Sequence, residues 1–324
     1  MIDLSDEMIS LSSEKRRALW RDLYFRECLA DLSDACGDEV PIETSFPLGL
    51  LTFKPDAVFG RRLRPAIDLL VQNSFRPIWM SPVRYTRHSM RELWRYNWDT
   101  YTTDRLALTT MMHTSCESLM LILHDPQTAR TGIPASVRLS DLKGSAAPED
   151  RRPGQLRDVL SPPNAVINFV HVADEPGDVI REVGIFLDRA DRQRLWRDVL
   201  ADPQADVTEQ AISLSAQLEG ECDAHDFDFE ASLSRVQARG FVSREAAERL
   251  RSVARGEEPK IRLDDLHSLV FSPQAEEIPV WDFVSIACGV LELVRDGAPD
   301  LLPGAGIDDW KAHLGGVPVP TAGA

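Results

Sequence analysis

The sequence predicts an α+β protein, with an antiparallel sheet followed by an α-helical C-terminal region. Apolar runs of strand length occupy residues 48–53, 75–83, 119–123 and 166–172. Apolar residues at helical spacing occupy residues 55–70, 86–96 and 178–187. The resulting order, β-α-β-α-β-loop-β-α, is compatible with an antiparallel sheet that helices cover on one face.

The segments on either side of this pattern read as helical. Residues 12–35 place leucines at helical spacing after a Ser-Ser-Glu start and before Gly37, so we expect an amphipathic helix that packs on the following domain. The polar stretch 125–163, with its prolines and glycines, is expected to be a long loop. The tail from Gly315 is expected to be loose. Helical signals then continue at residues 191–200, 209–218, 233–240, 243–254 and 280–294.

Composition limits the classes of function. A chain of 324 residues that is 43% hydrophobic and 27% charged can bury a sizeable core, in one large or two modest domains. Its formal net charge of −16 argues against a nucleic-acid partner, because such binding depends on dense basic surfaces. An anionic ligand would therefore need a local basic pocket.

The cysteines and the apolar runs predict the cellular compartment of the protein. The five cysteines are scattered and contain no CxxC pair, which fits a reducing cytoplasm with neither a disulfide framework nor a zinc site. Residues 1–7 are acidic and lack the features of a signal peptide. The longest apolar run, 280–294, contains Asp282 and Glu292 and is too short to span a bilayer. We therefore expect a cytoplasmic protein with no membrane partner.

A histidine and a carboxylate form the main candidate site. His171 lies in the apolar run 166–172, and Glu182 follows eleven positions later on a predicted helix. Neutral imidazole can act as a nucleophile and bear positive charge, and a carboxylate on its second nitrogen would fix the tautomer. A lone histidine is usually structural, as we expect for His113, but Glu182 and a second motif favour function here.

That second motif is Lys54-Pro55-Asp56 at the end of the first predicted strand. A transferring phosphoryl group spreads negative charge over its oxygens, so a lysine at this place suits phosphate binding. Asp56 is expected to cap the helix that Pro55 begins. None of the five lysines is followed by Ser or Thr, which disfavours a P-loop kinase.

Together these motifs, over about residues 47–187, resemble the active-site motifs of nucleoside diphosphate kinases. The resemblance implies a ferredoxin-like antiparallel sheet, with His171 as the phosphate acceptor, Glu182 as its support and Lys54 on the phosphates. It divides the chain into an N-terminal helical extension (1–46), a nucleoside diphosphate kinase-like domain (47–187) and a helical C-terminal domain or extension (188–324).

The same resemblance implies further nucleotide-binding residues. Asn168 takes the place of the sugar-hydroxyl contact, and Asp174 that of the aspartate in the family's His-Gly-Ser-Asp element. Arg157 matches an arginine that reaches the phosphates, and Arg138 and Tyr96 are looser matches to a second arginine and a tyrosine. The chain departs from the family pattern at Val172 and Ala173, which replace the Gly-Ser pair, and at residues 103–106, where the base platform does not align. Separately, Trp94, Trp98 and Tyr101 could form a stacking surface, but aromatic residues at helical spacing are more often in the core, and we expect them there.

The predicted function is phosphotransfer from a nucleoside triphosphate to a phosphate acceptor, such as a nucleoside diphosphate, through phosphohistidine at His171. Mg²⁺ would arrive with the nucleotide, with no protein metal site. A catalytically inactive nucleotide-binding or scaffold protein, whose C-terminal helices bind a partner, is the alternative. The family also implies oligomers, which the extensions could block or replace. If the motifs matched by accident, Lys54, His171 and Arg157 would not share a cleft.

Overall fold

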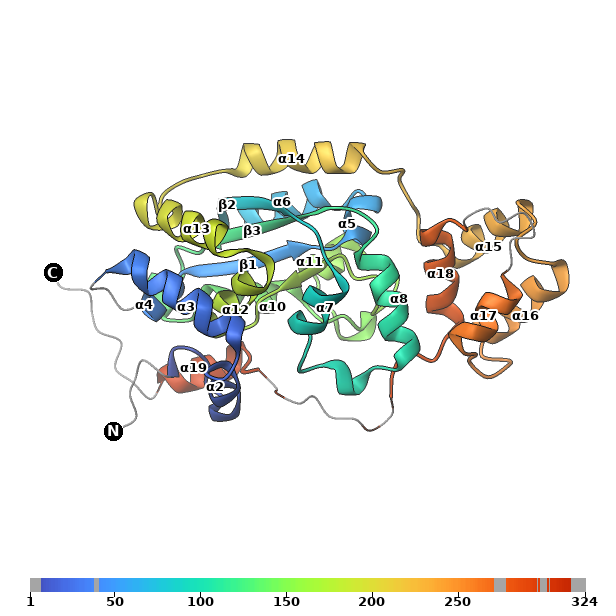
Figure 1. Cartoon of the computed structure of the whole chain (residues 1–324), viewed down its shortest axis with the longest axis horizontal. Coiled ribbons are helices and arrows are strands. Elements are labelled where there is room, and N and C mark those ends of the chain that lie inside the picture. The colour runs from blue at the N-terminus through green and yellow to red at the C-terminus, as the bar shows by residue number, and fades with distance from the viewer. Residues whose placement is uncertain are drawn as a thin grey trace.

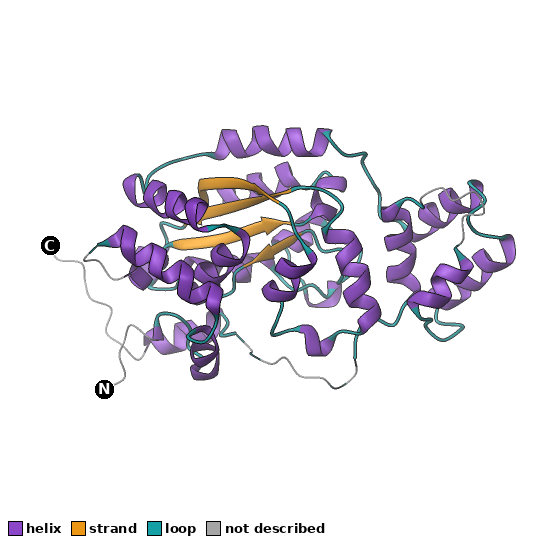
Figure 2. Cartoon of the chain, in the orientation of Figure 1, coloured by secondary structure: helices purple, strands orange, loops and turns teal. Residues whose placement is uncertain are grey.

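The fold centres on a four-stranded antiparallel sheet with the strand order β2-β3-β1-β4 (Figures 1 and 2). The computed structural model describes residues 7–37, 41–270, 278–295, 297, 302 and 304–315. The strands are β1 (Leu48–Phe53), β2 (Arg76–Val83), β3 (Ser118–His124) and β4 (Val170–Val172). The predicted α+β class with an antiparallel sheet is confirmed, and this strand order is that of a ferredoxin-like sheet.

The register of the sheet sets the position of the candidate nucleophile. Strand β1 pairs with β3 on one side and with β4 on the other, and all of its residues are buried. In β4, His171 lies opposite Thr52 of β1. The predicted strand 166–172 is shorter than expected, because regular pairing begins only at Val170.

Helices cover both faces of the sheet, so the expectation of one covered face is wrong. Leu51 and Phe53 face a core formed with α6 (Leu63–Gln72), α11 (Leu156–Leu160) and α14 (Thr208–Gly220). Leu48 and Leu50 face a second core formed with α3 (Leu23–Cys36), α12 (Pro176–Phe186) and α13 (Arg189–Ala201). Because side chains alternate along a strand, a strand that is buried on both faces is expected to be mainly apolar, as β1 is apart from Thr52.

The N-terminal segment forms two helices instead of the single predicted helix. Helix α2 (Ser13–Leu19) ends before Asp22, whose carboxylate accepts the backbone N–H groups of Tyr24 and Phe25 and starts α3. Helix α3 then ends at Gly37, as predicted, with a left-handed φ of 65°. It packs on α12, which confirms the expected contact with the following domain.

Two other predictions about the middle of the chain are corrected. The predicted helix 55–70 is interrupted, giving α5 (Pro55–Phe59) and α6, because Arg61 has a left-handed φ of 57°. The predicted loop 125–163 contains helices. Apart from α11, they are α9 (Thr128–Thr131), α10 (Ala135–Lys143) and the 3-10 turn η2 (Pro148–Asp150). Between β2 and β3 the chain forms α7 (Arg87–Leu93), η1 (Trp98–Thr100) and α8 (Thr103–His113).

The C-terminal region is helical, and its helices are distributed over the molecule. They are α13, α14, α15 (Phe229–Ala238), α16 (Arg244–Ala254), α17 (Leu263–Leu269), α18 (Val280–Val290) and α19 (Ile307–Gly315). Helices α15 to α18 gather at one end of the molecule in Figure 1, whereas α19 returns to the side of α10. A short α4 (Pro41–Ser45) precedes β1. The domain boundaries at 46 and 187 stay predictions, and the tail 316–324 lies outside the described residues.

Candidate active site

Most of the residues that the sequence singled out line a single pocket with a volume of about 380 Å³. Its walls come from β4, α8, α12 and the loops around them, with contributions from the N-terminal helix α2 and the segment before α19. The predicted residues that line it are Lys54, Tyr96, Arg157, Asn168, His171, Asp174 and Glu182. Lys54, His171 and Arg157 thus share a cleft, which an accidental match of short motifs does not account for.

His171 and Glu182 form the hydrogen-bonded pair that the spacing suggested. The Nε2 atom of His171 lies 2.9 Å from Oε1 of Glu182. Strand β4 presents the ring and α12, which follows after a short turn, presents the carboxylate. An ionised Glu182 accepts the Nε2–H bond of a neutral ring, so the free lone pair lies on Nδ1, which has no hydrogen-bond partner among the described residues. The ring is only 14% exposed, and the edge of Trp94 packs on it at 5.5 Å.

Glu182 is a buried carboxylate with one satisfied oxygen. Burial raises its pKa, and the neighbouring His171 acts in the opposite direction. Its second oxygen, Oε2, is buried and has no hydrogen-bond partner within the described part of the chain. The positive charge that would develop on the His171 ring during nucleophilic attack is therefore the interaction that best stabilises this anion.

A strained turn precedes the histidine. Phe169 has a left-handed φ of 67°, and the N–H of Val170 donates to the carbonyl of Asn168 at 2.8 Å, so residues 168–170 form a γ-turn. The N–H of Phe169 donates to Oδ2 of Asp56 and its carbonyl accepts the N–H of Lys54. These two bonds hold a conformation that a bulky residue rarely adopts and thereby set the start of β4.

Lys54 lies in the same wall of the pocket. Its Nζ lies 3.2 Å from Oδ2 of Asp56 and donates to the carbonyl of Val166 at 3.3 Å. Burial lowers the pKa of Lys54 to about 8, against the opposing effect of Asp56. The expectation that Asp56 caps the helix is wrong, because Lys54 is the N-cap residue and Asp56 instead binds Lys54 and the Phe169 amide.

Arg157 and Asn168 are largely occupied by bonds within the protein. The guanidinium of Arg157 donates to the carbonyls of Gly144, Asn168 and Val170 and to Oδ1 of Asn168. These four bonds leave one of its five N–H groups for a ligand. The amide nitrogen of Asn168 donates to the carbonyl of Ala165 at 2.8 Å. Burial lowers the pKa of Arg157 to about 10.

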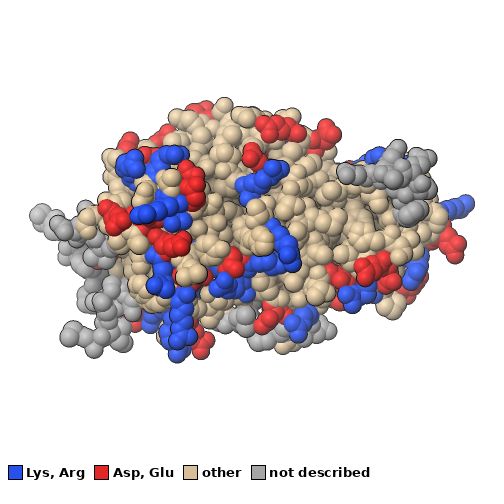
Figure 3. All heavy atoms as spheres, viewed as in Figure 1, with Lys and Arg blue, Asp and Glu red and all other residues tan. Residues whose placement is uncertain are grey.

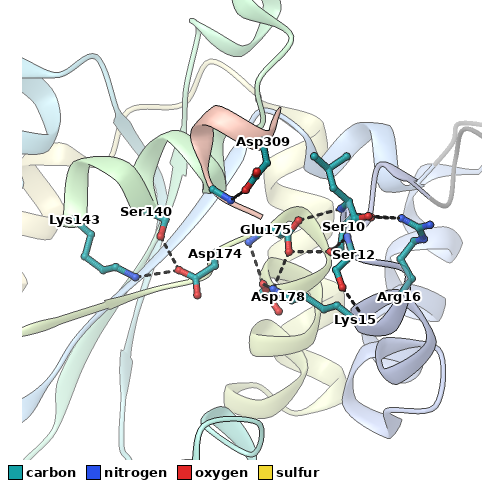
Figure 4. Close-up of polar contacts among 12 residues, drawn as sticks. Ser10, Ser12, Lys15, Arg16, Ser140, Lys143, Asp174, Glu175, Asp178 and Asp309 are labelled. Carbon is teal, nitrogen blue, oxygen red and sulfur yellow. Dashed lines mark hydrogen bonds and ion pairs between the residues drawn. The ribbon is translucent and has the colours of Figure 1, made fainter. Parts of the chain in front are cut away.

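Asp174 joins the end of β4 to α10. Its Oδ1 accepts from Oγ of Ser140 at 2.6 Å and from Nζ of Lys143 at 3.0 Å (Figure 4). Burial acts to raise the pKa of Asp174, but Lys143 and Lys15 outweigh it and hold the pKa below its usual range. Asp174 is therefore an anion at neutral pH and keeps Lys143 at the rim of the pocket.

The N-terminal extension reaches the pocket through Lys15, which sequence reasoning missed. Its Nζ lies 3.0 Å from Oε2 of Glu175 and 2.5 Å from Oδ2 of Asp178 (Figure 4). Glu175 is fully buried and also accepts from the hydroxyl of Ser10 and the N–H of Leu11. Nothing local to residue 15 could reveal this contact, because its partners lie more than 150 positions away along the chain.

Two looser predictions differ in outcome. Tyr96 lines the pocket beside Arg181, whose guanidinium lies 5.2 Å from the ring centre and is held by Asp22. Arg138 does not line the pocket, because it pairs with the buried Asp125 and lies over the ring of Phe75. The Arg138 match therefore gains no geometric support.

The pocket is basic although the chain is acidic. Six basic side chains line it against three acidic ones, whereas the whole chain has a net charge of −16. On the face seen in Figure 3, by contrast, Lys and Arg side chains are interspersed with Asp and Glu. Trp94, Trp98 and Tyr101 are only partly buried and also line the pocket. The expectation that they belong to the core is borne out in part for Trp94, which packs against the small buried cluster around Tyr85, and is wrong for Trp98 and Tyr101. Basic side chains that an anionic ligand needs are therefore gathered in the pocket, although most of them are already paired with carboxylates.

Comparison with known proteins matches the chain to solved structures but to no protein family. No protein-family model matches the chain, and no curated protein matches it. Solved structures similar to it include two nucleoside diphosphate kinases. The Aquifex aeolicus enzyme has 18% identity and a TM-score of 0.35, covering 43% of this chain and 92% of its own. The Halobacterium salinarum enzyme in complex with CDP has 16% identity and a TM-score of 0.35, covering 44% of this chain and 87% of its own.

The described residues contain no group of three or more His, Cys, Asp or Glu side chains placed to hold a metal ion. Magnesium bound to the phosphates of a nucleotide needs no such group, since phosphates and water supply most of its ligands. The expectation that Mg²⁺ arrives with the nucleotide stays a prediction. Among the same residues, no helix is both long and apolar enough to cross a membrane.

Proposed function

We propose that the protein is a nucleoside diphosphate kinase-like phosphotransferase that works through phosphohistidine at His171. The observation that carries this proposal is the pair formed by His171 and Glu182, with Nδ1 free, in a pocket that also holds Lys54. The donor is a nucleoside triphosphate with its magnesium, and the acceptor is a second phosphate compound such as a nucleoside diphosphate. The proposal is supported by the hydrogen-bond geometry of His171 and Glu182 and by the basic side chains that line the pocket.

The chemistry proceeds in two displacements. First, the Nδ1 lone pair of His171 forms a bond to the terminal phosphorus of the nucleoside triphosphate. The bond from that phosphorus to the bridging oxygen breaks, and the nucleoside diphosphate leaves with the electron pair. The ring keeps its Nε2 proton, and Glu182 stabilises the resulting positive charge. In the second displacement, a terminal oxygen of the acceptor attacks the phosphorus and the nitrogen–phosphorus bond breaks, so the ring returns to its neutral form.

Other residues of the pocket have supporting roles in the proposal. Lys54 neutralises charge on the transferring phosphoryl group, and Arg157 offers its one remaining N–H. Tyr96, Asn168 and Asp174 contact the nucleotide or hold the cations that do. Val172 and Ala173 are buried, and Val172 does not have a left-handed φ, so the loss of the family's glycine creates no backbone strain there.

Labelling tests the proposal. Incubation with ATP that is radiolabelled at the terminal phosphate should give protein-bound phosphate that acid removes and alkali does not. His171→Ala should abolish it, and His88→Ala, an exposed histidine on α7, should label like the native protein. Labelling that persists in His171→Ala would reject the assignment.

A second candidate is a protein that binds nucleotides without transferring phosphate. It is favoured by one observation: Arg157 and Asn168, two of the predicted ligand contacts, are bonded mainly to the protein itself. Measuring nucleotide binding together with phosphate exchange between ATP and a different nucleoside diphosphate separates the candidates. Binding without exchange would favour the second.

A further inference from the structure

The basic side chains of the pocket differ in whether the protein already neutralises them. Lys15 pairs with Glu175 and Asp178, Lys54 with Asp56, and Lys143 with Asp174. Arg181 pairs with Asp22, and Arg157 donates four hydrogen bonds to protein oxygens. The guanidinium of the sixth cation, Arg105 on α8, has neither a hydrogen bond nor an ion pair with any described residue.

Arg105 is also held in place and partly removed from water. Its guanidinium lies flat against Tyr101, 3.7 Å from the ring centre, and its Nε atom is buried without a partner. Burial lowers its pKa, which shows that its surroundings disfavour the charge. An unpaired, partly desolvated cation is costly unless something compensates it, and the described protein supplies no carboxylate.

We infer that Arg105 is the principal residue of this pocket that binds the phosphate anion of the ligand. This deepens the proposed function and rests on it only for the identity of the ligand as a nucleoside triphosphate. The inference follows from elimination among the six cations and from the planar fork of a guanidinium, which fits two phosphate oxygens. Arg105 and Lys54 both line the pocket, and the charge of Arg105 contributes to lowering the pKa of Lys54, after burial.

The C-terminal region holds the segment that carries Arg105. Tyr101 forms an antiparallel bridge with Val294, and the hydroxyl of Thr102 donates to the carbonyl of Glu292 at 2.8 Å. Next to Arg105, the carboxylate of Asp104 accepts two bonds from Arg262, at 2.6 and 3.0 Å, and one from the N–H of Leu263. We call these contacts of residues 101–104 with 262–263 and 292–294 the clasp.

Binding of inorganic tripolyphosphate tests the inference without a base or a sugar. Arg105→Gln should weaken tripolyphosphate and MgATP alike, by about 10- to 100-fold, the usual effect of losing a charge-assisted contact. Arg105→Lys, which keeps the charge and loses the fork, should fall between. The matched control is Arg87→Gln, which removes an exposed cation of the neighbouring α7 that does not line the pocket, and it should bind like the native protein.

Thermal unfolding of the ligand-free variants separates a binding role from a structural one. Because Arg105 is unpaired, Arg105→Gln should melt no lower than the native protein, whereas an arginine that supports the fold would lower the melting temperature. Three results would overturn the inference. The first is that Arg105→Gln binds tripolyphosphate as tightly as the native protein, and the second is that Arg87→Gln loses as much affinity as Arg105→Gln. The third is that the native protein does not bind tripolyphosphate at all.

The inference and the proposed function can fail separately. Loss of tripolyphosphate binding in Arg105→Gln, in a protein that never forms phosphohistidine, would support the role of Arg105 and reject the transferase. Phosphohistidine formation with unchanged binding in Arg105→Gln would do the reverse.

Discussion

At the residue scale, the site depends on how a few side chains divide their bonds. His171 gives one nitrogen to Glu182 and keeps the other, whereas Arg157 gives nearly all of its donors to the protein. Two residues with similar support from sequence motifs therefore have different capacities to act on a ligand. The hydrogen bonds that each side chain already forms show how free it is to bind a ligand, and the sequence motifs do not.

Glu182→Gln should slow phosphorylation of His171 while leaving the fold intact. The amide can still contact Nε2, but it no longer stabilises a positively charged ring, and loss of one preorganised electrostatic contact costs about 100-fold in rate. Rapid-quench measurement of label incorporation checks this. A rate equal to that of the native protein would mean that the carboxylate charge plays no part.

The affinity for MgATP should fall as the pH rises through about 8, because Lys54 loses its proton there. The pKa of Lys54 is lowered from its usual value by burial, so the lysine is a cation below about pH 8 and neutral above it. Calorimetric titration across this range checks the prediction. In Lys54→Met the step should vanish, and a step of the same size there would assign it to another group.

At the element scale, α12 links the active-site carboxylate to the N-terminal helices. Gly184 lies where α12 crosses α3, and an added Cβ would meet the backbone oxygen of Tyr24. Helix α3 thus packs against the helix that carries Glu182, without a side chain between the two backbones at this point. The position of Glu182 depends on this contact.

Gly184→Ala should therefore destabilise the protein by about 1 to 3 kcal/mol, since overpacking forces α3 away from α12. The matched control is Gly220→Ala. Gly220 ends α14 in open space, so the free energy of unfolding of this variant should be unchanged or slightly higher. Chemical denaturation of both variants measures the difference. Equal stability of the two would show that the α12 and α3 contact tolerates a methyl group.

The clasp predicts a smaller and more specific effect. Arg262→Gln should weaken tripolyphosphate binding by up to about fivefold, because the Arg262 side chain is largely exposed and solvent weakens its ion pair with the buried Asp104. Arg262→Lys should restore part of the affinity. Arg255→Gln, which breaks an exposed pair with Glu257 in the same region, should bind normally. If Arg262→Gln binds tripolyphosphate as tightly as the native protein does, the clasp has no role in binding.

The elements that sequence predicted well are those with strong local signals. Strand β1 coincides with its apolar run, and β2 and β3 begin within one residue of their predicted starts. The break between α5 and α6 was not predicted because it involves long-range contacts. Arg61 adopts its left-handed backbone while its guanidinium donates to the carbonyls of Glu219 and Cys222, far along the chain. Local propensity contains no record of such partners.

The residues of the candidate site likewise fall into those that the sequence predicts and those that only the structure reveals. His171, Glu182 and Lys54 could be found from sequence because they lie within short motifs on regular elements. Arg105 could not, since its significance lies in having no ion-pair or hydrogen-bond partner for its guanidinium among the described residues, which only the packed structure reveals. Lys15 could not either, because residues of α2 meet the α12 turn only through the tertiary fold.

At the scale of the whole molecule, both ends of the chain approach the same pocket. Lys15 comes from α2, and Leu302 and Gly304 come from the segment before α19, so residues outside 47–187 complete its walls. The acidic exterior and the basic pocket together favour a small anion as ligand over a polyanionic surface. Association of the C-terminal helices with a further copy or another protein stays a prediction.

The most direct test of the account is the position of the phosphate on the protein. After incubation with MgATP, phosphorus NMR of the protein, with mass spectrometry of its peptides under alkaline conditions, identifies the modified residue and the nitrogen that carries the phosphate. The account predicts phosphate on Nδ1 of His171, because Glu182 occupies Nε2. Phosphate on Nε2, on another residue, or on none would contradict it.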